Sequence, residues 1–132
     1  MRAMRARCHV GHDPALAVEH PDWCQRNSDD TSRPTLCLNS AYVAKTIWPW
    51  MIKAVAAPDC KALEFELDAS TAQPCWCEAC TQHLRAAGFA LDELAPRQEH
   101  AQASLQRFKD ETCSYEQAIK PGIVVRFVGP TT

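Results

Sequence analysis

The densest group of metal-ligating residues in this 132-residue chain lies in the segment PCWCEACTQH. It places Cys75, Cys77 and Cys80 within six residues, and His83 follows three positions later. The Cys77-x2-Cys80 spacing at the start of a predicted helix brings both sulfurs to one side of the first turn, where the helix dipole favours thiolates. Zinc binds four nitrogen or sulfur ligands in a tetrahedron. We therefore predict a zinc site formed by Cys75, Cys77, Cys80 and His83.

A second group of candidate ligands lies near the beginning of the chain. Cys8-x3-His12 and His20-x3-Cys24 are mirror-image pairs with seven residues between them. Each pair can converge on an ion from one turn of backbone, and the intervening loop is long enough to return the chain. Metal binding would also order a polar segment that proline residues interrupt. We predict a second zinc site at Cys8, His12, His20 and Cys24.

The cysteine count leaves alternatives to these metal sites. Eight cysteines is an even number, which also suits a disulfide framework in a secreted or organellar protein. The basic start of the chain has no apolar stretch of a secretory signal after it, so we expect an intracellular, reducing compartment where disulfides rarely persist. A small redox or iron–sulfur protein is a further alternative, and Cys60 or Cys113 could replace His83 as the fourth ligand. Cys37 lies outside both groups and is expected to be an ordinary buried thiol.

Composition excludes several classes of function. The formal net charge of -2 argues against binding to nucleic acid or to an anionic membrane surface. The most apolar stretch, residues 41–57, is interrupted by Lys45, Pro49 and Lys53 and is too short to span a membrane. With only four glycines, the chain has no phosphate-binding glycine loop, and it lacks a nucleophile elbow. These absences favour a protein without catalytic activity.

The hydrophobic pattern predicts a small α+β fold. Strict alternation in LEFEL makes Leu63–Leu67 a strand with its two glutamates on a solvated face, and IVVRFV between turn signals makes Ile123–Val128 a second strand. We expect the two to form a short sheet with about three helices around it. The first 39 residues show no helical or strand period and are expected to be irregular. The prediction is thus one domain, 1–132. It has an irregular segment at 1–39 that a bound metal ion holds in place, and an α+β core at 40–132.

Three helices are expected in that core. The first covers residues 41–55, with a kink or break at Pro49. Its surface is apolar except for one solvent-exposed stripe formed by Lys45, Pro49 and Lys53. The second covers residues 77–87, and Gly88 stands where a left-handed residue commonly ends a helix. The third follows Leu91, with apolar residues at alternating steps of three and four.

Taken together, these patterns indicate a zinc-stabilised interaction or accessory module that binds a protein partner. A disulfide-stapled accessory protein is the main alternative, and a small redox or iron–sulfur protein is the next. The patterns do not decide whether the chain is an enzyme, although they favour a protein without catalytic activity.

Overall fold

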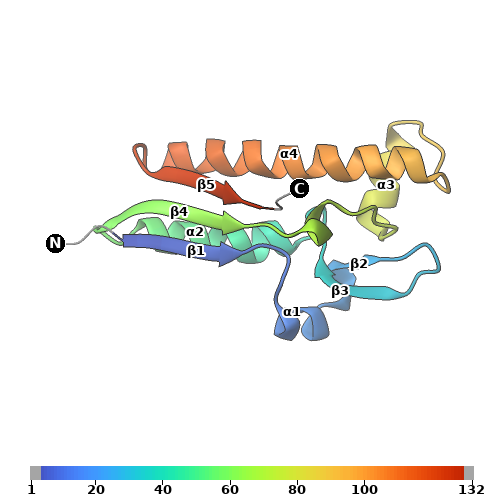
Figure 1. Ribbon diagram of the computed structural model, residues 1–132, viewed down its shortest axis with the longest axis horizontal. Coiled ribbons are helices and arrows are strands. Elements are labelled where there is room, and N and C mark those ends of the chain that lie inside the picture. Colours follow the sequence, from blue (N-terminus) through green and yellow to red (C-terminus); the bar gives the residue numbers. More distant parts are fainter. Residues whose placement is uncertain (1–3, 130–132) are drawn as a thin grey trace.

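The computed structural model describes residues 4–129 and shows two small sheets with helices beside them (Figure 1). The mixed α+β class that the sequence predicts is confirmed. The strands are β1 (Met4–His9), β2 (Cys24–Arg26), β3 (Ser32–Leu36), β4 (Cys60–Glu66) and β5 (Val124–Val128). The helices are α1 (Pro14–Glu19), α2 (Trp48–Val55), α3 (Glu78–Ala86) and α4 (Leu94–Ile119), with short turns η1 (Pro21–Trp23), η2 (Val43–Ile47) and η3 (Ala69–Ala72).

A three-stranded parallel sheet forms the centre of the fold, in the order β1-β4-β5. The two strands expected from the sequence are direct neighbours in it, with Leu63 opposite Val125 and Phe65 opposite Phe127. Helices α2 and α4 pack on the same face of this sheet, since the ring of Phe65 lies 5.7 Å from that of Trp50 and 6.2 Å from that of Phe108. Leu63 and Phe65 are fully buried there, as the alternation in LEFEL predicts.

The opposite face of the sheet carries charge, and here one expectation is wrong. Glu64 is 6% exposed and does not lie on a solvated surface. The parallel neighbour β1 brings two arginines over it, with Arg5 Nε 3.0 Å and Arg7 Nη2 3.5 Å from its carboxylate oxygens. A buried carboxylate is stable only with such partners, and the sequence did not reveal β1 as a strand.

The N-terminal third of the chain is ordered, in contrast to the irregular segment that we expected. Residues 4–36 contain β1, α1, β2 and β3. β1 pairs in register with β4 from Arg5–Ala62 to His9–Glu66, so its backbone groups are satisfied by a strand more than fifty positions away. Strand β1 is polar and short, and only this pairing makes it a strand.

The helices follow the predicted pattern with adjustments at their ends. The expected break at Pro49 appears as a change from the π-helical turn η2 to α2, with Pro49 in the first turn of α2 and exposed as expected. Gly88 ends α3 with a left-handed φ of 81°. In α4 the buried face starts at Arg97 and Ala101, whereas Leu94 is exposed. No helix within residues 4–129 is long and apolar enough to cross a membrane.

Candidate metal centre

Four cysteine sulfurs meet at one point of the structure. Cys37, Cys75, Cys77 and Cys80 place their Sγ atoms within 4.8 Å of one another. The Sγ of Cys37 lies 3.5 Å from that of Cys80 and 3.6 Å from that of Cys77. In a tetrahedral zinc–thiolate centre with bonds near 2.3 Å, neighbouring sulfurs are about 3.8 Å apart. The four sulfurs therefore stand at a separation that suits one tetrahedral ion.

Two segments that are far apart in the sequence supply these sulfurs. Cys37 directly follows β3, and its amide donates a hydrogen bond of 2.7 Å to the carbonyl of Trp23 beside the start of β2. Cys75 lies in the loop that leads from β4 to α3, Cys77 is the N-cap of α3, and Cys80 lies in its first turn. The first turn of α3 thus acts as predicted from the Cys77-x2-Cys80 spacing, because it turns both sulfurs to one side.

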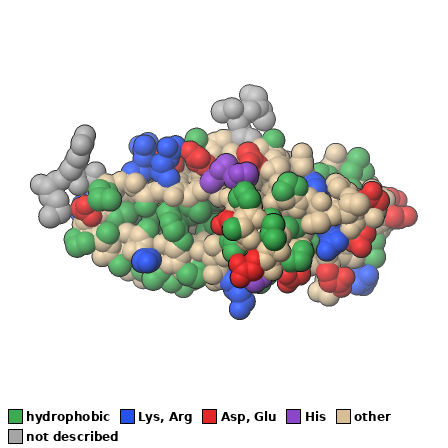
Figure 2. Space-filling model, turned by 90° about the horizontal axis from the view of Figure 1, so that it is seen from below, with side chains coloured by type: hydrophobic (Ala, Val, Ile, Leu, Met, Phe, Trp, Pro, Cys, Tyr) green, Lys and Arg blue, Asp and Glu red, His purple; other side chains and the backbone are tan. Residues whose placement is uncertain are grey.

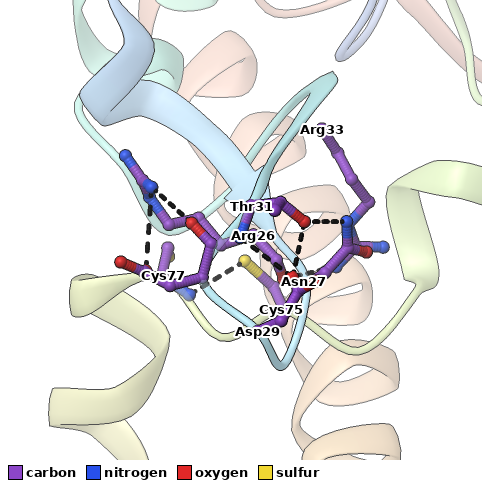
Figure 3. A network of polar contacts seen from close by, with 8 residues as sticks. Arg26, Asn27, Asp29, Thr31, Arg33, Cys75 and Cys77 are labelled. Carbon is purple, nitrogen blue, oxygen red and sulfur yellow. Dashed lines mark hydrogen bonds and ion pairs between the residues drawn. The ribbon is translucent and has the colours of Figure 1, made fainter.

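The cysteine loop is anchored to the β2–β3 hairpin (Figure 3). The amide of Trp76 donates to the carbonyl of Arg26 over 3.0 Å. The guanidinium of Arg33 donates to that same carbonyl over 2.9 Å and also to the carbonyl of Pro74. These bonds connect the residues on both sides of Cys75 to the hairpin that carries Cys37.

Arg97 of α4 holds the loop from its other side. Its side chain is 3% exposed, and its guanidinium donates over 2.9 Å to the carbonyls of both Cys75 and Leu91. The guanidinium also lies 5.2 Å from the ring centroid of Trp76. Among the residues that the structure describes, no carboxylate lies within ion-pair distance of Arg97. Arg97 therefore brings a buried positive charge to the backbone of Cys75.

Hydrogen bonds donated to the cysteine sulfurs favour the thiolate form. The amide of Asn39 donates to Cys37 Sγ and its side-chain amide to Cys80 Sγ, each over 3.4 Å. The amide of Cys77 donates to Cys75 Sγ, also over 3.4 Å. Hydrogen bonds from Cys37, and then from Cys77 and Cys80, lower the pKa of the Cys75 thiol, whereas the same contacts raise the pKa of the donor Cys37. Donation to sulfur stabilises the thiolate, which is the form that binds metal.

One residue predicted for this group lies outside the cluster. His83 is not part of the cluster, because it lies one turn further along α3 and its Nδ1 faces His100 Nε2 at 3.3 Å. The fourth sulfur comes from Cys37, which we expected to lie outside both groups. Cys37 and Cys80 are 43 positions apart, and only the path of the β2–β3 hairpin brings them together. No spacing rule applied to the sequence could have selected Cys37.

The structure does not bring Cys8, His12, His20 and Cys24 together. Within residues 4–129, the four-cysteine cluster is the only group of three or more side chains whose ligand atoms lie close enough to share an ion. The Sγ of Cys24 donates to the carbonyl of Ala17 over 3.6 Å, and the ring of His20 stacks on that of Trp23 at 3.7 Å. Burial raises the pKa of the Cys8 thiol to about 11.

Histidine side chains nevertheless gather in one patch on the face shown in Figure 2. The rings of His9 and His12 lie 4.8 Å apart.

None of the eight cysteines forms a disulfide.

Comparison with known proteins gives a fold and no family. No family model matches this sequence, and no curated protein matches it. The fold is similar to part of the solved structure of alpha-L-fucosidase isoenzyme 2 from Paenibacillus thiaminolyticus, with a TM-score of 0.81 and 20% sequence identity. The likeness covers 95% of this chain and 20% of the fucosidase chain, so the chain spans about a fifth of that enzyme's length. At this identity the likeness concerns the fold alone.

Proposed function

We propose that Cys37, Cys75, Cys77 and Cys80 bind one zinc ion that stabilises the domain and takes no part in catalysis. The observation that carries this proposal is the meeting of four buried sulfurs, all within 4.8 Å of one another, from segments far apart in the sequence. Isolated buried cysteines do not need such a meeting, whereas a tetrahedral ion does. The ion would fasten the β2–β3 hairpin to the start of α3.

The closed character of the cluster supports a structural role. Four protein ligands fill the tetrahedron, and catalytic zinc sites keep one position open for water or substrate. The four cysteines are between 2% and 6% exposed, so a substrate has no access to the ion.

Charge balance supports a metal–thiolate centre as well. A zinc ion with four thiolates carries two net negative charges. Arg97 brings a buried positive charge to the backbone of Cys75, where it would offset part of them. Neutral thiols would leave this guanidinium without an opposite charge.

The module itself would serve as an intracellular interaction or accessory domain for a protein partner. A net charge of -2 does not favour nucleic acid, and the cluster needs a reducing compartment to keep its thiols.

The test is a metal and thiol analysis of protein purified without chelator. We expect close to one equivalent of zinc per chain, and four thiols that react with a disulfide reagent only after the metal is removed. Replacement by cobalt(II) should give the charge-transfer and d–d absorption of a tetrahedral thiolate site. Iron in place of zinc, with its visible absorption, would favour the iron–sulfur alternative. Absence of metal together with oxidised thiols would favour the disulfide alternative.

A second candidate is a carbohydrate site at the carboxyl edge of the parallel sheet, where sites of α/β proteins commonly lie. His9 ends β1 there, and its Nε2 lies 3.5 Å from Oδ2 of Asp68, just after β4. Burial acts to raise the pKa of Asp68, but hydrogen bonds from Ser70 and the nearby His9 lower it below the ordinary value. His9, Glu66 and Asp68 line one cavity, and the fold likeness is to a fucosidase.

Titration with L-fucose, followed by the amide NMR shifts of these residues, tests this second candidate. Saturable shifts that disappear in Asp68→Asn but persist in Asp29→Asn would support it. Shifts that are absent in the unmodified chain would exclude fucose as its ligand.

A further inference from the structure

Two histidines from different helices face each other beside the cysteine cluster. His83 in α3 and His100 in α4 place Nδ1 and Nε2 at 3.3 Å, with their rings at 81° to each other. Both side chains reach solvent and line a cavity of about 240 Å³. The pair is distinct from the four cysteines, because neither imidazole belongs to that group of ligand atoms.

The separation of the two nitrogens suits a shared metal ion. Two imidazole nitrogens bound to one tetrahedral zinc ion at 2.0–2.1 Å are about 3.3–3.4 Å apart. The observed 3.3 Å therefore matches the spacing of two ligands of one ion.

We propose that His83 and His100 form a second, open zinc site that binds exchangeable zinc and links α3 to α4. The two imidazoles supply two ligands, and water molecules fill the remaining positions. An open site with so few protein ligands releases its ion more readily than the closed four-cysteine centre. Occupancy would thus follow the concentration of free zinc, which the closed centre would not do.

The surroundings keep both imidazoles in the form that binds metal. Burial, and then the guanidinium of Arg107, lowers the pKa of His83. Burial, and then His83 together with Arg107, lowers the pKa of His100. Neutral imidazole is the ligand for zinc. The charge of Arg107 opposes a cation, but its Nε lies 3.8 Å from the carboxylate of Glu111, which offsets part of that charge.

Zinc titration by isothermal calorimetry and competition dialysis tests the site on the full chain. The expected result is one tight equivalent and one weaker equivalent. His83→Gln and His100→Gln should each weaken the second equivalent at least tenfold and leave the tight one unchanged. His20→Gln is the matched control, since that imidazole stacks on Trp23 and faces no second histidine there. Thermal midpoints of the metal-free variants should equal that of the unmodified chain, because these histidines are near the surface.

Each outcome decides the proposal, and it does so separately from the four-cysteine centre. No weaker equivalent in the unmodified chain, or one that persists in both histidine variants, would overturn the second site. A single weak equivalent that His100→Gln removes would support it, even though the four-cysteine zinc centre would then have failed. A tight equivalent that His83→Gln removes would overturn it too, since His83 would then belong to the closed centre.

Discussion

Replacement of Cys37 by serine is the sharpest perturbation of the proposed four-cysteine zinc site. Cys37 Sγ lies 3.5 Å from Cys80 Sγ and 3.6 Å from Cys77 Sγ, so its loss would open one corner of the tetrahedron. Binding of a structural zinc ion is also folding free energy, on the order of 10 kcal/mol for a whole site. A domain has only about 5–15 kcal/mol of total stability, so a large fraction of that amount is decisive. We expect Cys37→Ser to unfold the domain or to lower its stability by more than about 4 kcal/mol.

Cys60→Ser is the matched control for this change. Cys60 is buried to the same 2% exposure as Cys37, but its Sγ donates to the carbonyl of Ala62 and lies outside the cluster. Placing a hydroxyl at such a site costs only about 1–3 kcal/mol. The two variants therefore separate the loss of a ligand from the loss of a buried thiol.

Thermal and urea unfolding with and without a strong chelator measures the difference. Chelator should bring the unmodified chain and Cys60→Ser down towards Cys37→Ser, and it should leave Cys37→Ser nearly unchanged. Equal, small losses in both variants, with no response to chelator, would refute the reasoning. The same series on Cys80→Ser should reproduce the result for Cys37→Ser.

Other consequences of the structure can be checked in the same way. Arg97→Met should cost about 2–4 kcal/mol in urea unfolding and weaken metal retention in a chelator competition, because it orphans two buried carbonyls and removes a buried charge. Arg85→Met, at an exposed position of α3, should do neither. Gly88→Ala should cost about 1 kcal/mol from backbone strain alone, since φ is 81° and a Cβ there meets no atom within 4 Å; an unchanged unfolding curve would contradict the left-handed helix end. Burial raises the pKa of Cys8 from 9.0 to about 11, so the folded state holds the proton that the unfolded state loses first. Stability should be full below pH 9 and fall as the pH rises towards 11, and Cys8→Ala should reduce that fall in a pH series of unfolding midpoints.

The strongest local patterns were sufficient to predict several elements. Alternation placed Leu63 and Phe65 on the buried face of a strand, and turn signals marked the strand that ends at Val128. The glycine at position 88 and the proline at position 49 act through their own backbone constraints, so their effects are visible without tertiary structure. The same holds for Cys77 and Cys80, because neighbouring turns of one helix fix the distance between their sulfurs.

The sequence could not predict contacts between distant segments. Strand β1 depends on pairing with β4, and Glu64 is buried only because β1 brings Arg5 and Arg7 over it. The grouping of Cys8, His12, His20 and Cys24 relied on sequence distance, whereas in the structure Cys24 donates to the carbonyl of Ala17 and His20 stacks on Trp23.

The sequence by itself determined that cysteines near position 77 are spaced for metal, since that spacing is a property of one helical turn. The tertiary structure alone decided which residue completes the set. The β2–β3 hairpin brings Cys37 to Cys80, which lies 43 positions away in the sequence. The packing of α3 beside α4 brings His83 to His100. Whether side chains can bind one ion depends on the distances between them in space. Sequence spacing fixes those distances only within a single element of secondary structure.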